Sequence, residues 1–144
     1  MAHNNTNTGT NEIMRIQGDG KVGIGTDDPE ALLSLNISNG GENTPLMLRN
    51  SNFTNGSTVG IGFLNESLTT GAAKTIITSE RTGSWGRGSL HFLLDNGGDP
   101  SVADLSDARM TITKEGNVGI ATTTPAEKLE VDGSIRMVDG NQAA

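Results

Sequence analysis

Apolar residues in this chain occur in short alternating clusters, separated by segments rich in glycine, asparagine, serine and threonine. Successive side chains of a β-strand point to opposite faces, so such alternation predicts strands with one apolar face. The clusters predict strands at 14–16, 22–26, 32–37, 45–50, 58–64, 73–79, 89–95, 110–112, 118–122, 129–131 and 134–138. Only the short segment 102–109 suggests a helix. The pattern therefore predicts an all-β protein.

An internal repeat is the strongest feature of the pattern. Residues 14–35 and 110–131 align without a gap at an offset of 96 residues, and nine of 22 positions are identical. Such self-similarity indicates one supersecondary unit used twice. Each copy contains two short apolar runs around a glycine-bearing turn, which predicts a β-hairpin, followed by a proline and a third strand.

The repeat divides the chain into five expected regions. Between the copies, apolar clusters recur every 12–15 residues with turn residues between them, which is typical of a meander of antiparallel strands. The expected regions are a flexible polar arm (1–12), a first repeat (13–38), a central antiparallel β-domain (39–109), a second repeat (110–133), and a C-terminal strand and tail (134–144).

The alternating glycines of the repeat predict a close approach by another segment. Val22 and Ile24 should share one strand face, and Gly23 and Gly25 the other. Glycine weakens a strand unless another backbone must come near, so we expect the bare face to lie against a neighbouring chain and the apolar face to pack in a narrow core. The residues expected to pack in an assembly are Val22, Gly23, Ile24, Gly25, Val118, Gly119 and Ile120.

Composition supports an assembly of several copies. The 144 residues are 33% hydrophobic and 3% aromatic, and they include 20 glycines, so one chain can build only a thin core. Small domains already bury proportionally less surface than large ones. Copies stacked around an axis would supply the missing burial and cover strand edges. We expect an elongated, intertwined homotrimer, although composition alone does not give the number three.

Charge and residue usage exclude several classes of function. Lysine and arginine number 10 against 17 aspartates and glutamates, and this net charge of −7 argues against a general nucleic-acid binder. The chain has no cysteine, which excludes disulfides and thiolate chemistry. Its apolar runs are far shorter than the roughly 20 residues of a membrane helix. The polar segment 1–12 is unlike a secretory signal, so we expect neither a signal nor a membrane partner.

Three segments match ligand-binding patterns only in part. Gly18, Gly20 and Gly23 have the spacing of a dinucleotide fingerprint, but alternation and a proline follow where a helix is required, so a turn and a strand are predicted. The segment 95–99 carries oxygen ligands without regular calcium-loop spacing, which favours a plain turn. His91 lies in a predicted strand and is expected at the surface or an interface. A metal site built from three copies of His91 is the alternative.

No enzymatic activity, cofactor or metal is expected. The chain lacks the Gly-x-Ser-x-Gly elbow of many hydrolases, and His3 and His91 cannot form a cluster within one chain. A glycosidase needs two carboxylates at a fixed separation across a groove, and the sequence does not place such a pair. A polysaccharide depolymerase is therefore only a third hypothesis.

The segment 81–89 is the best candidate for binding a receptor. It holds the only tryptophan, Trp85, between Arg81 and Arg87 in a glycine-rich loop. An exposed aromatic ring can stack on a sugar, and arginine supplies directed hydrogen-bond donors. The alternative is that Trp85 packs beneath the loop, which is favoured because large aromatic side chains are mostly buried.

The repeats resemble those of a known family. The strings DGKVGIGT at 19–26 and GNVGIATTTPAEKLEVDG at 116–133 are similar to the GNVGIGT-x-x-P-x-x-K-L-x-V-x-G repeats of bacteriophage tail-fibre proteins. The middle of the chain resembles the spacer found between such repeats. The first copy departs from the pattern at Asp27, Asp28 and Leu32. Many family members end in a self-cleaving chaperone domain, and none is visible here.

The resemblance implies a trimeric, β-rich fibre shaft that displays or spaces a receptor-binding tip. We therefore expect a structural subunit of a phage fibre that contributes to host attachment, made in the host cytoplasm and acting on the virion outside it. The expected partners are other copies of the chain, fibre or baseplate proteins, and a host surface glycan. The alternatives are a carbohydrate-binding recognition module and a head-fibre or capsid-decoration protein.

Overall fold

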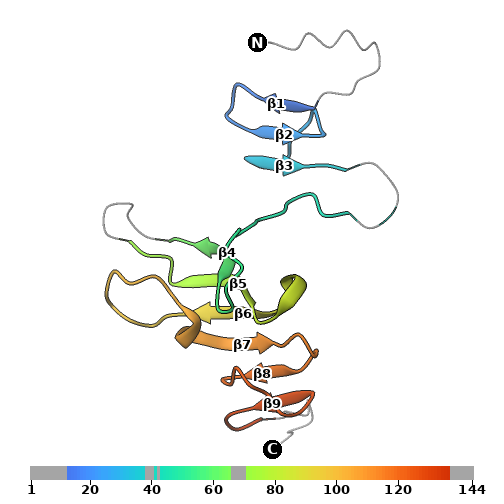
Figure 1. The fold of residues 1–144 in the computed structure, drawn as a ribbon. Coiled ribbons are helices and arrows are strands. Elements are labelled where there is room, and N and C mark those ends of the chain that lie inside the picture. Colours follow the sequence, from blue (N-terminus) through green and yellow to red (C-terminus); the bar gives the residue numbers. More distant parts are fainter. Residues whose placement is uncertain (1–12, 38–40, 42, 66–70, 137–144) are drawn as a thin grey trace, which may run out of the picture. The chain divides into compact units, whose positions relative to one another are not determined.

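The computed structural model describes residues 13–37, 41, 43–65 and 71–136, and within them it confirms the all-β class (Figure 1). The chain divides into two compact units, Met1–Met47 and Leu48–Ala144. The described strands are β1 (Met14–Ile16), β2 (Val22–Ile24), β3 (Leu33–Leu35), β4 (Thr58–Phe63), β5 (Thr75–Arg81), β6 (Gly88–Leu94), β7 (Ala108–Ile112), β8 (Val118–Ile120) and β9 (Leu129–Val131), with 3-10 turns η1 (Ser84–Gly86) and η2 (Leu105–Asp107).

The first unit contains a three-stranded sheet in the order β1-β2-β3. Strands β1 and β2 form the predicted antiparallel hairpin, with Met14 opposite Ile24 and Ile16 opposite Val22. Strand β3 then pairs with β2 in parallel, which the sequence pattern did not predict. A parallel return requires a crossover, and residues 25–32 make it within a single short segment.

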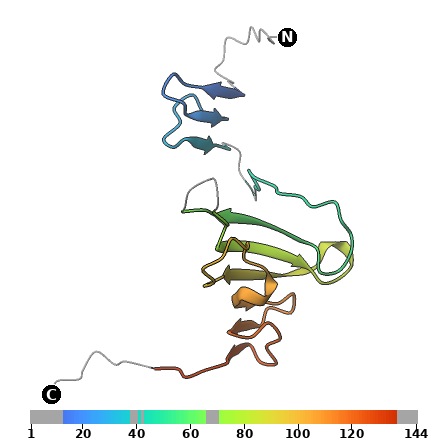
Figure 2. The ribbon, with the colours of Figure 1, turned by 90° about the vertical axis from the view of Figure 1, so that its left-hand side faces the viewer.

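The second unit contains a six-stranded sheet whose order follows the sequence, β4-β5-β6-β7-β8-β9 (Figures 1 and 2). Strands β4 to β8 pair antiparallel with their neighbours, as expected of a meander. Strand β9 pairs with β8 in parallel and so repeats the arrangement of β3 beside β2. A register shift between Phe92 and Leu93 interrupts the pairing of β6 with β7.

The two copies of the repeat share one backbone hydrogen-bond pattern, which confirms that they form the same local structure. The equivalent bonds, in pairs, are Gln17 N to Lys21 O and Thr113 N to Asn117 O, Val22 N to Leu32 O and Val118 N to Lys128 O, and Asn36 N to Ile24 O and Asp132 N to Ile120 O. Their lengths agree within about 0.2 Å, since all lie between 2.8 and 3.0 Å. The repeated sequence therefore specifies hairpin, crossover and parallel return together.

Three predicted elements are wrong. Residues 45–50 form no strand, because the Asn50 side chain donates to Thr58 O at 2.8 Å and accepts from Asn52 N at 2.9 Å in place of a ladder. Residues 134–136 are not in a strand, and 137–138 lie outside the described residues, as does the expected arm 1–12. The segment 102–109 contains only the single turn η2, which Asp104 caps by accepting from Ser106 N.

The six-stranded sheet has two different faces, and the chain covers one of them. This covered face is mixed, since Thr78, Ser89, His91 and Thr111 are buried on it and so is the apolar Leu93. The segment that follows β6 covers it, and η2 contacts β6. We call this side of the sheet the covered face.

The opposite side of each sheet is apolar, and among the described residues only the segment 50–57 approaches it, beside Val59, Ser79 and Arg81. The register aligns its side chains in rows, and none of them is buried. We call this side the apolar face. In the six-stranded sheet it contains Val59, Ile61, Phe63, Ile77, Leu90, Phe92, Leu94, Met110, Ile112, Val118, Ile120, Leu129 and Val131, and in the three-stranded sheet Met14, Ile16, Val22, Ile24, Leu33 and Leu35.

Candidate functional site

The structure separates the expected assembly residues into two groups. Val22 and Ile24 lie on the apolar face of the first unit, and Val118 and Ile120 lie on that of the second. They occupy equivalent places in the two copies, opposite methionine and isoleucine of the preceding strand. That these four side chains pack against another chain stays a prediction. Such packing requires that the chain's own segments leave them uncovered, as they do here.

The glycines of the repeat are explained within the chain. A Cβ at Gly23 would lie 2.5 Å from Thr26 O, and one at Gly119 would lie 2.3 Å from Thr122 O. Real Cβ atoms do not approach oxygen so closely, so the crossover segment itself requires glycine at both positions. The backbone expected to approach the bare face therefore belongs to the same chain, and these glycines carry no information about a neighbouring one.

Gly25 does not share a strand face with Gly23, because β2 ends at Ile24. Its φ is +74°, in the left-handed region, and a Cβ there would lie 2.1 Å from Asn36 O. Ala121 occupies the same place in the second copy with a φ of +58°. The position therefore serves to reverse the chain after β2 and β8, and only glycine adopts this backbone without steric cost.

The glycine motif that resembles a dinucleotide fingerprint forms the predicted turn and strand. Gly18 and Gly20 lie in the turn between β1 and β2, where Gly20 has a φ of +89°, and Gly23 lies in β2. No helix begins at this motif, so it lacks the helix N-terminus that would bind a pyrophosphate.

The expectation for His91 is wrong, because its side chain is buried on the covered face at 2% exposure. Its Nδ1 lies 2.9 Å from Thr111 Oγ1, and its Nε2 lies 3.1 Å from Glu80 Oε2. Both ring nitrogens therefore have partners within the chain, which contradicts a metal site shared by three copies. His3 lies outside the described residues, and among those described no three metal-ligating side chains cluster.

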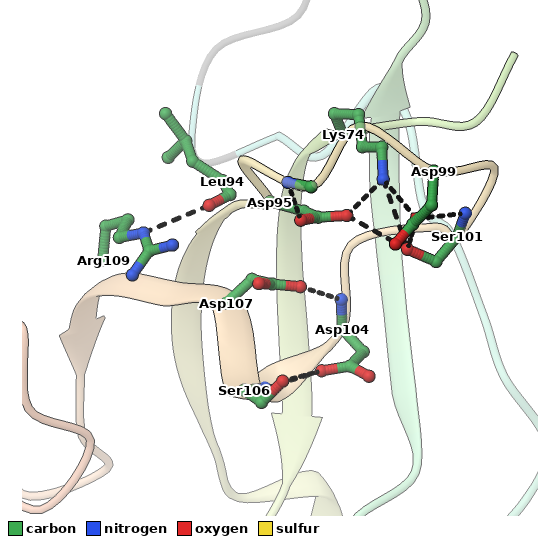
Figure 3. A network of polar contacts seen from close by, with 10 residues as sticks. Lys74, Leu94, Asp95, Asp99, Ser101, Asp104, Ser106, Asp107 and Arg109 are labelled. Atoms are coloured by element: carbon green, nitrogen blue, oxygen red, sulfur yellow. Dashed lines mark hydrogen bonds and ion pairs between the residues drawn. The ribbon is translucent and has the colours of Figure 1, made fainter.

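The segment 95–99 forms a turn that an internal cation closes (Figure 3). The Lys74 ammonium binds the carboxylates of Asp95 and Asp99 and lies 3.2 Å from Ser101 Oγ. It occupies the place between the carboxylates that a calcium ion would need. Hydrogen bonds from the hydroxyl and the backbone N–H of Ser101, with Lys74 next, lower the pKa of Asp99 to about 2. Hydrogen bonding to Asp95 raises the pKa of Lys74.

Trp85 is 98% exposed, so the interpretation that it packs beneath its loop is wrong. It lies in η1, in the tight connection between β5 and β6, where Arg87 N donates to Ser84 O at 3.3 Å. Trp85 and Gly86 both have positive φ, +62° and +73°, as do the two central residues of type I′ hairpin turns. Glycine meets this requirement easily, whereas tryptophan is strained there.

A cleft of about 450 Å³ lies beside this turn, within the second unit. Arg81 and Trp85 both line it, and Arg81 Nε donates to Phe53 O at 2.8 Å. Arg87, the third expected residue, is not among the lining residues, and its Nε donates to Ser84 O at 3.2 Å. The described residues that line the cleft are Asn50, Asn52, Phe53, Ser57, Thr58, Val59, Ser79, Arg81, Trp85 and Gly86.

Sequence reasoning missed the contribution of residues 50–57 to this cleft, because it placed a strand at 45–50. The available signal was the dense run of asparagine, serine and glycine around Phe53, which is typical of successive turns. In the structure, Asn52 Oδ1 accepts from Thr54 N at 3.0 Å, and Phe53 remains 73% exposed.

Comparisons with known proteins assign no family. No protein-family model matches the chain, and no curated protein is significantly similar to it. Within the described ranges, no helix has the length and apolar character needed to cross a membrane.

Proposed function

We propose that the chain is a structural subunit of a bacteriophage fibre, in which three copies pack their apolar faces around a common axis. The observation that carries this proposal is the apolar face itself. In each sheet the paired strands align their large apolar side chains on one side, and the described chain leaves most of that side uncovered.

The arrangement differs from what a monomeric sheet requires. An antiparallel sheet with one side in water normally buries its apolar side and exposes the other. Here the chain's own segments cover a side that mixes Leu93 with buried polar side chains, while Ile61, Phe63 and Leu129 in the apolar rows of the other side are 46–61% exposed. Large contiguous apolar patches are rare on monomers and mark interaction sites. Each Å² of apolar surface removed from water stabilises the buried state by roughly 25 cal/mol.

Copies of the same chain are the best-matched occupants of this face. A second copy offers a surface of the same length and apolar character, and in a symmetric assembly every copy gains the same burial. Besides its apolar rows, the apolar face of the six-stranded sheet includes the neutral side chains of Thr75 and Ser79, and the charge of Arg81 lies only at the end of β5. The number three follows from the resemblance of the repeats to fibre proteins, whereas the face itself requires only that another copy covers it.

A place on the virion and a contribution to host attachment belong to the same proposal, with other fibre or baseplate proteins as partners. A head fibre or a capsid decoration would use the same assembly. Carbohydrate recognition is a second candidate function, and the specific observation that favours it is the exposed Trp85 in its cleft.

Native mass spectrometry and small-angle scattering of the full chain test the fibre proposal together. The expected species has three times the chain mass of 14.9 kDa and scatters as a rod. A compact particle of one chain would overturn the proposal. A species of two chains would keep the covered apolar face and overturn the threefold arrangement.

A further inference from the structure

We propose that the cleft beside Trp85 binds a sugar that carries a carboxylate, with the sugar ring on the indole and the carboxylate at the Arg81 guanidinium. This inference rests on carbohydrate recognition as the second candidate function and adds the chemical class of the sugar. Val59, Ser79 and Arg81 of the cleft belong to the apolar face, so the inference also requires that neighbouring copies leave this end of the face open.

The aromatic side chains of the cleft are placed for a ligand rather than for packing. Trp85 is 98% exposed and Phe53 is 73% exposed, and both line the same cleft. Large aromatic rings are usually well buried, so two open rings in one cleft need an explanation. The backbone of Trp85 is also strained, with a φ of +62°. Strain at a residue whose side chain is almost fully exposed points to a binding role.

The rest of the cleft suits a hydroxyl-rich ligand. Short neutral polar side chains, among them Asn52 and Ser57, surround the rings. The volume of about 450 Å³ falls within the usual range of small-ligand sites. A sugar ring presents an apolar face of C–H groups to an aromatic ring and hydroxyls at its rim, which matches an indole bordered by amides and hydroxyls.

Charge selects the class of sugar. Arg81 is the only charged residue among the described residues that line the cleft, although the chain carries a net charge of −7. No aspartate or glutamate is among the described residues that line the cleft with Arg81, Trp85 and Phe53. The guanidinium uses its Nε to hold Phe53 O at 2.8 Å and has further N–H donors on its two terminal nitrogens. A carboxylate is the group that such a planar fork binds best.

Fluorescence titration gives a direct test, because Trp85 is the only tryptophan in the chain. The probes are glucuronic acid and N-acetylneuraminic acid, with glucose as the neutral counterpart of glucuronic acid. We expect both acids to shift the emission and to bind at least about tenfold more tightly than glucose, a ratio that corresponds to about 1.4 kcal/mol.

Substitutions at two positions, followed by calorimetry, assign the contacts. Trp85→Ala should weaken binding of both acids about tenfold or more, and Trp85→Phe should restore part of it because it keeps a ring. Arg81→Lys keeps the charge and removes the fork, so the preference for acid over glucose should fall several-fold. Arg109→Lys is the matched control, since its Nε donates to Leu94 O and it does not line the cleft.

The outcomes separate the levels of the proposal. If glucose binds as tightly as the acids, the acidic class is wrong while carbohydrate recognition stands. If none of the sugars binds, both are overturned. Native mass spectrometry of Trp85→Ala completes the test. An unchanged assembly with lost binding supports the site, whereas a dissociated assembly would overturn it by making Trp85 an interface residue.

Discussion

The two copies of the repeat have the same hydrogen-bond pattern but different surroundings. In the second copy, β7 continues into the sheet through its pairing with β6, whereas β1 has no strand on its outer edge among the described residues. Burial follows this difference. Met14 and Ile16 are 54% and 69% exposed, while their equivalents Met110 and Ile112 are only partly exposed.

This difference separates two kinds of information in the repeat. Local sequence, through its turns and glycines, specifies hairpin, crossover and parallel return in both copies. Burial of the apolar face depends instead on what lies beside it. In the second copy the neighbouring strand β6 supplies part of that cover, and in the first copy the cover must come from elsewhere.

The largest effect should come from a charge on the apolar face. Ile120→Asp places a carboxylate among the apolar rows of the larger sheet, and burying it unpaired between copies costs several kcal/mol, so we expect the assembly to dissociate. Ile24→Asp, the equivalent change in the smaller sheet, should weaken the assembly less. Native mass spectrometry measures both, with Thr123→Asp, an exposed crossover position, as the control. A fully assembled Ile120→Asp would contradict the proposed interface.

A smaller effect is expected where the crossover touches the sheet. Gly119→Ala and Gly23→Ala each place a Cβ within 2.5 Å of a threonine carbonyl oxygen in the same chain. We expect each to destabilise the fold by about 1–3 kcal/mol, as overpacking does. Chemical denaturation measures this cost. Equal losses in the two copies would show that the clash is local, and a negligible loss in either would contradict the intrachain explanation of these glycines.

The position with a left-handed backbone, Gly25 in the first copy and Ala121 in the second, should give a smaller difference between the copies. Gly25→Ala should cost about 1–3 kcal/mol, because an L-residue is strained at this φ and its Cβ would lie 2.1 Å from Asn36 O. Ala121→Gly relieves the same strain while adding freedom to the unfolded chain, so we expect a change within about 1 kcal/mol. Thermal unfolding of the two variants checks the pair. A strongly destabilised Ala121→Gly would show that the alanine side chain has a packing role.

The smallest effect concerns the stability of the 95–101 loop at low pH, and it distinguishes the central β-domain from the repeats. The pKa of Asp99 is lowered to about 2, so its carboxylate stabilises the folded 95–101 loop at pH values above its usual 3.8. That contribution is lost as the pH falls through about 2. Amide hydrogen exchange should therefore show the loop loosening in acid while β8 stays protected. Asp99→Asn should reduce the pH dependence of the loop, with the pKa of Asp95, which Lys74 also lowers, accounting for the rest, and an unchanged profile would refute this assignment.

Much of the fold could be predicted from the alternation of apolar residues. Each described strand was expected near its observed bounds, and the repeat correctly indicated one unit used twice. The prediction for 22–26 overran β2 because Gly25 looks like a strand glycine but turns the chain. The parallel pairing of β3 with β2 was missed, since alternation fixes the faces of a strand but not its partner.

The candidate site could be predicted only in part. Arg81 and Trp85 were identified from residue type, but Phe53 joins them through side-chain hydrogen bonds of asparagines that no periodicity reveals. The predictions that Trp85 is buried and that His91 lies at the surface or an interface, which followed the usual behaviour of these residue types, were both wrong. Trp85 lies at the tip of a tight turn, whereas His91 lies on the side of the sheet that the chain covers with its own loop.

Spin labels on single cysteines test the central claim most directly, because the chain has no cysteine of its own. Thr75→Cys places a label on the apolar face, opposite Phe63 and Leu94, and Thr123→Cys places one on the crossover. If copies meet through the apolar face, the distance between labels on neighbouring copies is shorter at position 75 than at position 123. No dipolar coupling at position 75, or a shorter distance at position 123, would contradict the account.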